Sequence, residues 1–348
     1  MIPHSRPTLG PEDADALVAV VESGRLSEGP LVAAFERALA GRLGRRGGVA
    51  ASSGSAALAL ALRALGVGAG DEVILPAYAC AAVGQAVRAV GASPVLADVG
   101  EDLGLAADAA ARRLSRRTAA VVVVHPFGYP LDLTPFLEWG VPVIEDCAHA
   151  LGASRSGRPA GALGAVAVCS FYATKMVAAG EGGMLLADRA SVLAAARAMR
   201  PGVRGSPGGF NQKLSDLAAG LGLAQLGRLD SFVARRRQIA HRYDDAFSGT
   251  VLRRRVGDPA AEPCFWRYVV RAPNAAALID GLRRRGVEAK RPVGDPLLLE
   301  GDADAFPRSA QAFAECVSLP LYPSLDEGEI ARVVDAVADV VAEAGWRR

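Results

Sequence analysis

From about residue 50 to residue 190 the sequence alternates helical stretches with short apolar runs, and this alternation is the strongest constraint on the fold. Runs such as "DEVILP", "TAAVVVVHPFG" and "AVAVCSFYA" indicate strands, and "SAALALALRAL", "ACAAVGQAVRAV" and "LDLTPFLEWG" indicate helices between them. Near-continuous Val, Ile and Leu runs separated by helices are typical of a mostly parallel sheet with helices on both faces. We therefore predict an α/β domain.

The C-terminal third of the sequence has a different pattern. Helical periodicity continues through residues 214–247 and predicts a helical bridge, after which "CFWRYVVRA", "AAALIDGLRRRG" and "EGEIARVVDAVADVVAEAG" indicate a smaller α+β unit. A chain of 348 residues, 51% of them hydrophobic, is long enough for two cores. We predict a large domain over residues 1–235, which includes the N-terminal segment, and a small C-terminal domain over residues 236–348.

Charge and cysteine usage exclude several classes of protein. A balance of 39 basic against 37 acidic residues gives no overall field that would attract nucleic acid or an anionic membrane. No window approaches the roughly 20 apolar residues of a membrane span, and the N-terminus lacks the pattern of a signal peptide. Five scattered cysteines without a C-x-x-C pair indicate free thiols rather than disulfides or a zinc site. We expect a cytoplasmic protein without a metal, nucleic-acid partner or membrane contact.

Candidate functional residues follow strands or turns, and ligands of parallel sheets bind at the carboxyl ends of strands. Ser55 in "ASSGSAAL" opens a helix whose N-terminus suits a phosphate, although a plain N-cap is the alternative. Asp146 ends the run "VPVIED" and requires a cation or strong donors there, or is an N-cap or part of a structural ion pair. Lys175 in "SFYATK" can be a Schiff-base nucleophile, or it can extend to solvent.

These three residues together match the needs of one cofactor. Pyridoxal phosphate requires a lysine for its aldehyde, an acid for its pyridine nitrogen and a helix N-terminus for its phosphate. Lys175, Asp146 and Ser55 supply these groups. Gly182 and Gly183 let the backbone come close beside the lysine. The sequence therefore predicts a pyridoxal-phosphate protein.

The sequence also resembles the DegT/DnrJ-type aminotransferases, which are sugar aminotransferases of the aspartate-aminotransferase fold. The likeness covers nearly the whole chain and includes "SSGSAALALALRALGVGAGDEVILPAY", "VIEDCAHALGA", "SFYATKMVAAGEGGML" and "FNQKLSDLAAGLGLAQL". It implies transfer of an amino group from an amino-acid donor, glutamate or glutamine, to a keto-sugar, a cyclitol ketone or a related small ketone. The expected pathways are secondary-metabolite or polysaccharide biosynthesis.

The resemblance also implies a role for each matching residue. Lys175 would form the internal aldimine and move protons, Asp146 would pair with the pyridine nitrogen, and His149 would lie near the 3-hydroxyl group of the cofactor. The phosphate would be held by Gly54, Ser55, the backbone N–H of Ala56, and Ser170. Asn211, whose loop before a helix could otherwise be a simple cap, would reach the phosphate of the neighbouring subunit's cofactor. The resemblance thus implies a homodimer with shared active sites.

Some positions depart from the family pattern. Cys80 stands where the family usually has an aromatic residue over the cofactor ring, with Tyr78 two residues earlier, and His149 stands where glutamine is common. The segment "RPGVRGSPGGFNQ" is short against relatives that use nucleotide-linked sugars, and this favours a smaller acceptor. Cations that could anchor an anionic donor or acceptor are Arg200, Arg204, Lys290 and Arg291.

Two other functions remain open at this point. One is a different pyridoxal-phosphate reaction, a dehydration or an aromatisation, although relatives that deoxygenate sugars replace the lysine with histidine. The other is a cofactor-binding regulatory protein without turnover, for which one would expect an added DNA-binding module or a strongly basic face.

Overall fold

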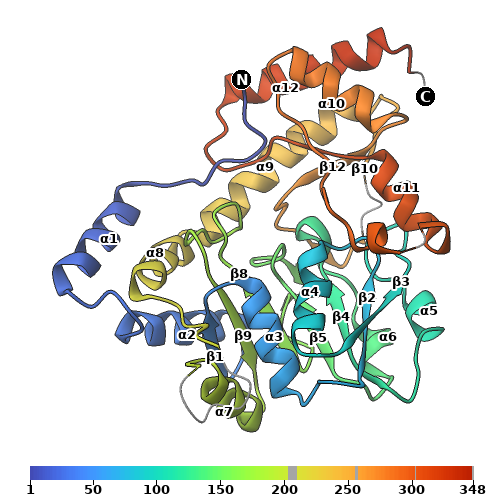
Figure 1. Cartoon of the computed structure of the whole chain (residues 1–348). Helices are drawn as coiled ribbons and strands as arrows, with labels where there is room; N and C mark the ends of the chain where they lie inside the picture. The colour runs from blue at the N-terminus through green and yellow to red at the C-terminus, as the bar shows by residue number, and fades with distance from the viewer. Residues whose placement is uncertain (203–209, 255–257, 302, 347–348) are drawn as a thin grey trace.

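The computed structural model describes residues 1–202, 210–254, 258–301 and 303–346. Its centre is a seven-stranded sheet in the order β1-β9-β8-β5-β4-β2-β3 (Figure 1). These strands are β1 (Gly47–Ala51), β9 (Gly183–Ala187), β8 (Val166–Ser170), β5 (Val143–Asp146), β4 (Thr118–Val124), β2 (Glu72–Pro76) and β3 (Ser93–Ala97). Strands β8, β5, β4, β2 and β3 pair in parallel, and β9 pairs antiparallel with both β1 and β8. The predicted mostly parallel α/β sheet is confirmed.

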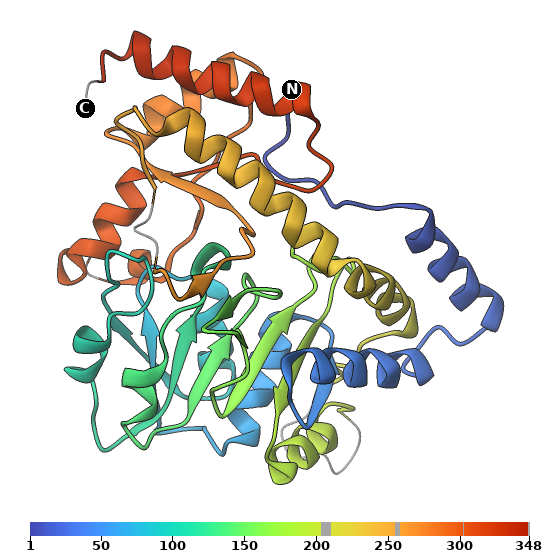
Figure 2. The ribbon, with the colours of Figure 1, turned by 180° about the vertical axis from the view of Figure 1, so that it is seen from behind.

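Helices cover both faces of this sheet, as the two opposite views show (Figures 1 and 2). The helices of this part are α1 (Pro11–Ser23), α2 (Pro30–Leu43), α3 (Gly54–Ala64), α4 (Ala81–Ala89), α5 (Ala107–Ala111), α6 (Thr134–Leu137), α7 (Ala190–Met199) and α8 (Asp216–Gly227). Successive side chains of a strand point to opposite faces. Val73 and Leu75 accordingly join the apolar cluster that contains residues of α3, α4 and α7, whereas Ile74 between them joins the cluster on the other face.

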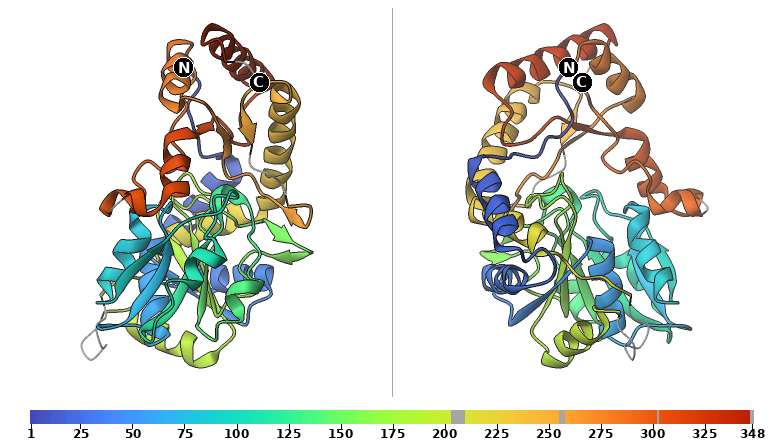
Figure 3. Two further views of the ribbon diagram at one scale, coloured as in Figure 1. Left: turned by 90° about the vertical axis from the view of Figure 1, so that its right-hand side faces the viewer. Right: turned by 60° about the vertical axis from the view of Figure 1, so that its left-hand side comes forward.

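The C-terminal part has its own small sheet and its own core. Strands β10 (Arg253–Arg254), β12 (Tyr268–Arg271) and β13 (Cys316–Leu319) form an antiparallel sheet in that order. The helices here are α9 (Leu229–Phe247), α10 (Ala275–Arg284), α11 (Pro307–Glu315) and α12 (Glu327–Glu343). The N-terminal residue Ile2 joins this core, and the N-terminus lies among the helices of this part of the chain (Figure 3). We keep the division between residues 1–235 and 236–348 as a proposal, with α9 as the helix that crosses it.

Two segments differ in detail from the prediction. The helical bridge consists of two helices, because α8 ends at Gly227 and α9 begins at Leu229, with Arg228 between them in a non-helical conformation. The helix expected in "LDLTPFLEWG" contains only the four residues of α6, and Gly140 shortly after it has a left-handed φ of 68° that reverses the chain.

The remaining elements are short. Strands β6 (Ser154–Arg155), β7 (Arg158–Pro159) and β11 (Ala261–Glu262) form a second three-stranded sheet. It joins the chain after β5 to the segment before β12. Single 3₁₀ turns are η1 (Pro126–Gly128), η2 (Leu297–Glu300) and η3 (Ala303–Ala305). None of the helices within the described ranges combines the length and apolar character that crossing a bilayer requires.

Candidate active site

The carboxyl ends of the parallel strands meet at one edge of the sheet, and a cavity of about 270 Å³ lies there. Strand β5 ends at Asp146 and β8 ends at Ser170, while β1 leads into the turn before α3. Seven of the nine predicted site residues line this cavity: Gly54, Ser55, Cys80, Asp146, His149, Ser170 and Lys175. Ala56 and Asn211 are not among its described lining residues. Residues from separate parts of the sequence are thus brought into one site.

Lys175 is held in a tight turn that follows β8. Its N–H donates to the carbonyl of Tyr172 at 2.8 Å, and its Nζ lies 4.2 Å from the centre of the Trp266 ring. Burial lowers the pKa of this amine from 10.5 to about 8, although the Asp146 carboxylate acts in the opposite direction. A lysine with such a pKa has a substantial neutral fraction near physiological pH, and the neutral amine is the nucleophile.

Asp146 presents a buried carboxylate to the same cavity. Its exposed fraction is 7%, and its Oδ1 accepts a hydrogen bond from the N–H of Ala148 at 2.9 Å. Burial raises the pKa of this carboxyl, while that hydrogen bond and the positive charge of Lys175 oppose the rise. A buried carboxylate of this kind favours a cationic partner.

The N-terminus of α3 forms the opposite side of the cavity. Ser53 caps this helix, and its Oγ accepts the N–H of Ala56 at 3.1 Å. Within the described part of the chain this leaves the N–H groups of Gly54 and Ser55 without an acceptor, as is usual at a helix N-terminus. The backbone of Gly54 lies so close to Ser170 that a Cβ at residue 54 would be 2.9 Å from the Cβ of Ser170. The helix N-terminus and a serine hydroxyl therefore lie together, a combination that suits a phosphate.

His149 is stacked between aromatic side chains. Its ring centre lies 3.8 Å from that of Trp266 and 6.1 Å from that of Phe127, with interplanar angles of 14° and 15°. Burial, together with the charges of Lys175 and Arg267, lowers its pKa well below the ordinary value, so the imidazole is neutral at physiological pH. Its Nδ1 is buried and has no hydrogen-bond partner in the described chain. A polar atom in that state fits a ligand that completes the hydrogen bond.

The two candidates for covering a cofactor ring differ in burial. Cys80 is the exposed residue that precedes α4, and it lines the cavity. Tyr78 also lines the cavity, but it is only 4% exposed and packs edge-on against Phe127 with 6.3 Å between ring centres. Neither position replaces the missing aromatic side chain in an obvious way.

The sequence did not reveal that Trp266 contacts Lys175, although this tryptophan is not itself among the residues that line the cavity. Trp266 is 6% exposed, and its indole N–H donates to the carbonyl of Thr174 at 2.7 Å. It lies in the segment between β11 and β12, far along the chain from the lysine. No local pattern in "CFWRYVVRA" pointed to this contact, because an apolar run beside a strand is ordinarily part of a core.

The predicted anion anchors receive no support from their positions. Arg200 is buried and paired with Glu28 and Glu36, and Lys290 is paired with Glu288 at 2.9 Å. The guanidinium group of Arg291 donates to a backbone carbonyl, and none of these three cations lines the cavity. Arg204 and most of the short segment between the lysine region and Asn211 lie outside the described residues.

A buried acid–histidine pair lies next to the site in the sequence. His125, Glu145 and Cys147 place possible metal ligand atoms within 4.8 Å of one another. However, the Glu145 carboxylate already accepts the N–H groups of Gly161 and Leu163 at 2.8 and 2.7 Å, and its Oε2 contacts His125 Nε2 at 3.1 Å. Burial alone would raise the pKa of Glu145, but these hydrogen bonds keep it low. We interpret this group as a structural network.

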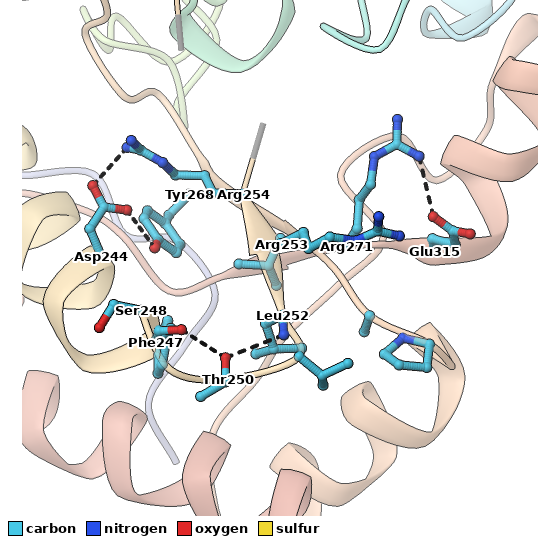
Figure 4. Close-up of a pocket in the computed structure, with 14 residues that line it drawn as sticks. Asp244, Phe247, Ser248, Thr250, Leu252, Arg253, Arg254, Tyr268, Arg271 and Glu315 are labelled. Carbon is cyan, nitrogen blue, oxygen red and sulfur yellow. Dashed lines mark hydrogen bonds and ion pairs between the residues drawn. The ribbon is translucent and has the colours of Figure 1, made fainter. Parts of the chain in front are cut away.

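A larger cavity of about 700 Å³ lies in the C-terminal part (Figure 4). Its two carboxylates are already paired: Asp244 contacts Arg254 at 2.7 Å and the hydroxyl of Tyr268 at 2.8 Å, and Glu315 contacts Arg271 at 3.2 Å. None of the sequence-predicted site residues lines it. The chemistry therefore points to the smaller cavity at the edge of the large sheet.

Comparisons with known proteins identify the family of the chain. The model of the DegT/DnrJ/EryC1/StrS aminotransferase family matches residues 7–338. The spore coat polysaccharide biosynthesis protein SpsC of Bacillus subtilis (strain 168) is 34% identical, with 98% of this chain and 97% of that protein covered.

Solved structures of aminotransferases are also similar to this chain. The aminotransferase TlmJ from Streptoalloteichus hindustanus is 34% identical with a TM-score of 0.93, and 99% of this chain and 100% of that chain are covered. A putative sugar aminotransferase from Streptococcus pneumoniae, Spr1654 in its PLP form, is 26% identical with a TM-score of 0.92, with 98% and 99% covered. The predicted aspartate-aminotransferase-like fold is thus confirmed.

Proposed function

Because the chain belongs to the DegT/DnrJ/EryC1/StrS aminotransferase family, we propose that Lys175 is the residue that links covalently to the cofactor in this active site. The chain is an aminotransferase, and pyridoxal phosphate is its cofactor. The observation that carries the proposal is the Lys175 amine, buried and with a lowered pKa, in one cavity with Asp146 and the N-terminus of α3.

The residues of the cavity fit each part of this cofactor. Lys175 is available to the aldehyde, and the Asp146 carboxylate suits a protonated ring nitrogen. The unpartnered Nδ1 of His149 suits the ring hydroxyl group. Ser170 and the free N–H groups at the start of α3 suit the phosphate. We propose these four roles, with Ala56 acting through its capping bond to Ser53 rather than by direct contact.

When bound, pyridoxal phosphate supplies an aldehyde and a conjugated ring that accepts electrons. The protein contributes positions and protons. Lys175 can accept a proton at Nζ and return it, because its pKa of about 8 is close to working pH. The Asp146 carboxylate would hold a proton on the ring nitrogen, because its negative charge would stabilise the positive charge there in a buried environment. The buried aromatic rings of Trp266 and Phe127 limit the access of water.

We propose a keto-sugar as the amino acceptor and glutamate or glutamine as the donor. Support comes from relatives named for spore coat polysaccharide biosynthesis and as a sugar aminotransferase. A cyclitol ketone remains the second candidate acceptor, on the ground of the short segment that precedes Asn211.

The test is a turnover assay with each donor and a panel of nucleotide-linked keto-sugars, free keto-sugars and cyclitol ketones. We expect an amine product, detected by mass spectrometry, that requires a keto-sugar and is absent with Lys175→Ala. Turnover only with cyclitol ketones would overturn the keto-sugar assignment. Full turnover by the alanine variant would overturn the role of Lys175.

We further infer that the active site is completed by a second copy of the chain. Asn211 is exposed and does not line the cavity of its own chain, and the neighbouring Phe210 is 69% exposed. Large apolar side chains with that exposure often mark interfaces. In α1, Val18 and Val21 are also more than half exposed. A homodimer in which Asn211 reaches the partner's phosphate site accounts for both observations.

We propose the cytoplasm as the location of the protein. All five cysteines are free thiols, and four of them are buried. Free thiols of this kind suit a reducing compartment. The proposal predicts activity in the cytosolic fraction of the source cells, and activity confined to a secreted fraction would contradict it.

A further inference from the structure

Trp266 reaches Lys175 from the C-terminal part of the chain. Its indole N–H donates to the carbonyl of Thr174 at 2.7 Å, immediately before the lysine, and the Lys175 Nζ lies over its ring at 4.2 Å from the centroid. The same ring stacks on His149 at 3.8 Å. One side chain therefore contacts the backbone before the lysine, the lysine amine and the neighbouring imidazole.

The backbone around Trp266 is fixed against the turn η1, which follows strand β4. The N–H of Cys264 donates to the carbonyl of Gly128 at 3.0 Å, and the N–H of Arg267 donates to the carbonyl of Phe127 at 3.2 Å. Gly128 is required for this approach, because a Cβ there would lie 2.6 Å from the nitrogen of Trp266. The position of the indole ring is thus set by two loops that hold each other.

A buried arginine strengthens this arrangement from the other side. The Nη1 of Arg236 donates to the carbonyls of Phe265 and Trp266 at 3.3 and 3.0 Å, and to that of Leu321 at 2.9 Å. Phe265 has a left-handed φ of 50°, which is costly for a residue with a side chain and persists only where surrounding contacts enforce it. Backbone strain next to a functional lysine agrees with a positional role for this loop.

We propose that Trp266 is a positioning residue, which fixes the Lys175 side chain so that its amine meets the aldehyde of the cofactor in one orientation. This inference rests on the proposed role of Lys175. A free lysine side chain has many rotamers, and restricting it before reaction raises the rate of condensation. The π face also attracts the protonated amine without a formal negative charge, so the amine can still lose its proton.

Several charged or titratable groups act on the same amine. Asp146 and Cys80 favour its protonated form, and Arg267 opposes it, while His149 is neutral. Arg267 lies on the Trp266 ring at 4.1 Å from the centroid. The Trp266 ring therefore contacts both the Lys175 amine and the Arg267 guanidinium group, so its removal would take one contact from each.

The test compares formation of the lysine–cofactor bond with binding of a ligand that cannot form it. The full-length protein is freed of cofactor and mixed with pyridoxal phosphate, and the condensation of amine and aldehyde, which releases water, is followed by absorbance. Binding of pyridoxamine phosphate, which has no aldehyde, is measured by calorimetry. The variants are Trp266→Phe and Trp266→Leu. The control is Trp139→Leu, because Trp139 packs on Phe136 and the Lys175 amine lies over the ring of Trp266 instead.

We expect Trp266→Leu to slow condensation by roughly tenfold or more, while the affinity for pyridoxamine phosphate changes by less than about threefold. Trp266→Phe keeps a ring face but loses the N–H donor, so it should lie between Trp266→Leu and wild type. The control should match wild type in both assays. A merely structural role would weaken both processes together, and equal losses in the two assays would overturn the inference, as would unchanged condensation in Trp266→Leu.

One further measurement separates this inference from the proposed function. The wild-type adduct is reduced with borohydride and its site is mapped by peptide mass spectrometry. A label on a residue other than Lys175 would refute the proposed function. A label on Lys175 together with normal condensation in Trp266→Leu would refute only the role of Trp266.

Discussion

Replacing Lys175 with methionine should make the cofactor-free protein more stable. Burial lowers the pKa of this amine from 10.5 to about 8, so the folded state disfavours its charged form. One pKa unit corresponds to roughly 1.4 kcal/mol, which gives about 3 kcal/mol for the whole shift. The residue as a whole is only half-buried, and solvent screening reduces the expected gain for Lys175→Met to about 2 kcal/mol.

The sign of the effect follows from proton binding. Below pH 8 the lysine is charged in both folded and unfolded states, and its burial cost is fully present. Between pH 8 and 10.5 the folded state loses the proton first, so the wild type regains stability as pH rises. The difference between variant and wild type should therefore fall from about 2 kcal/mol at pH 7 to about 0.5 kcal/mol at pH 10.

Urea denaturation of cofactor-free protein at both pH values measures this difference. The contributions of the other titrating groups to the free energy of unfolding are the same in the two proteins and cancel. Lys213→Met is the matched control, because Lys213 does not line the cavity and its replacement should show no such pH dependence. A stability gain that is equal at pH 7 and pH 10, or a loss at pH 7, would refute the lowered pKa of Lys175. Turnover should be absent in Lys175→Met at either pH.

Three further predictions concern the rest of the site. The side chain of Asp146→Asn can still accept the N–H of Ala148 but has no charge. We therefore expect kcat to fall by about 10²- to 10⁴-fold while the far-UV circular dichroism stays unchanged. A kcat within tenfold of wild type would contradict the role of Asp146. Gly183→Ala would place a Cβ 2.3 Å from the carbonyl oxygen of Ser53, the residue that caps α3. Fluorescence titration should then show an affinity for pyridoxal phosphate that is lowered by roughly tenfold or more. Wild-type affinity would count against the phosphate site. Mixing Lys175→Ala with Asn211→Ala subunits should restore about a quarter of wild-type activity through one intact site per mixed dimer, whereas no gain over the separate variants would mean that Asn211 acts within its own chain.

The sequence allowed the main part of the site to be predicted because of one property of parallel sheets. Residues after separate strands meet at one edge when the strands run in the same direction, so Asp146 and Ser170 could be expected at the same edge of the sheet. The strand order and the antiparallel direction of β9 were not predictable in the same way. They depend on pairing between segments far apart in sequence, and a short apolar run carries no signal for its direction.

The contact between Trp266 and Lys175 could not be predicted for a related reason. Trp266 comes close to Lys175 only because Phe127 and Phe265 adopt left-handed backbone conformations and two loops exchange hydrogen bonds. Propensity does not favour these conformations, and only the surrounding contacts hold them in place. Similarly, arginine-rich segments suggested anion anchors, but Arg200 pairs with the buried Glu36 and with Glu28, both more than 160 residues earlier in the chain.

The most direct test of the account is an absorbance spectrum of the purified protein with bound pyridoxal phosphate, before and after the addition of glutamate or glutamine. We expect a visible band that depends on Lys175 and that is lost as the cofactor takes up the amino group from the donor. A Lys175→Ala protein that gives the same band and the same response would contradict the central claim, as would a reconstituted wild-type protein that shows no band.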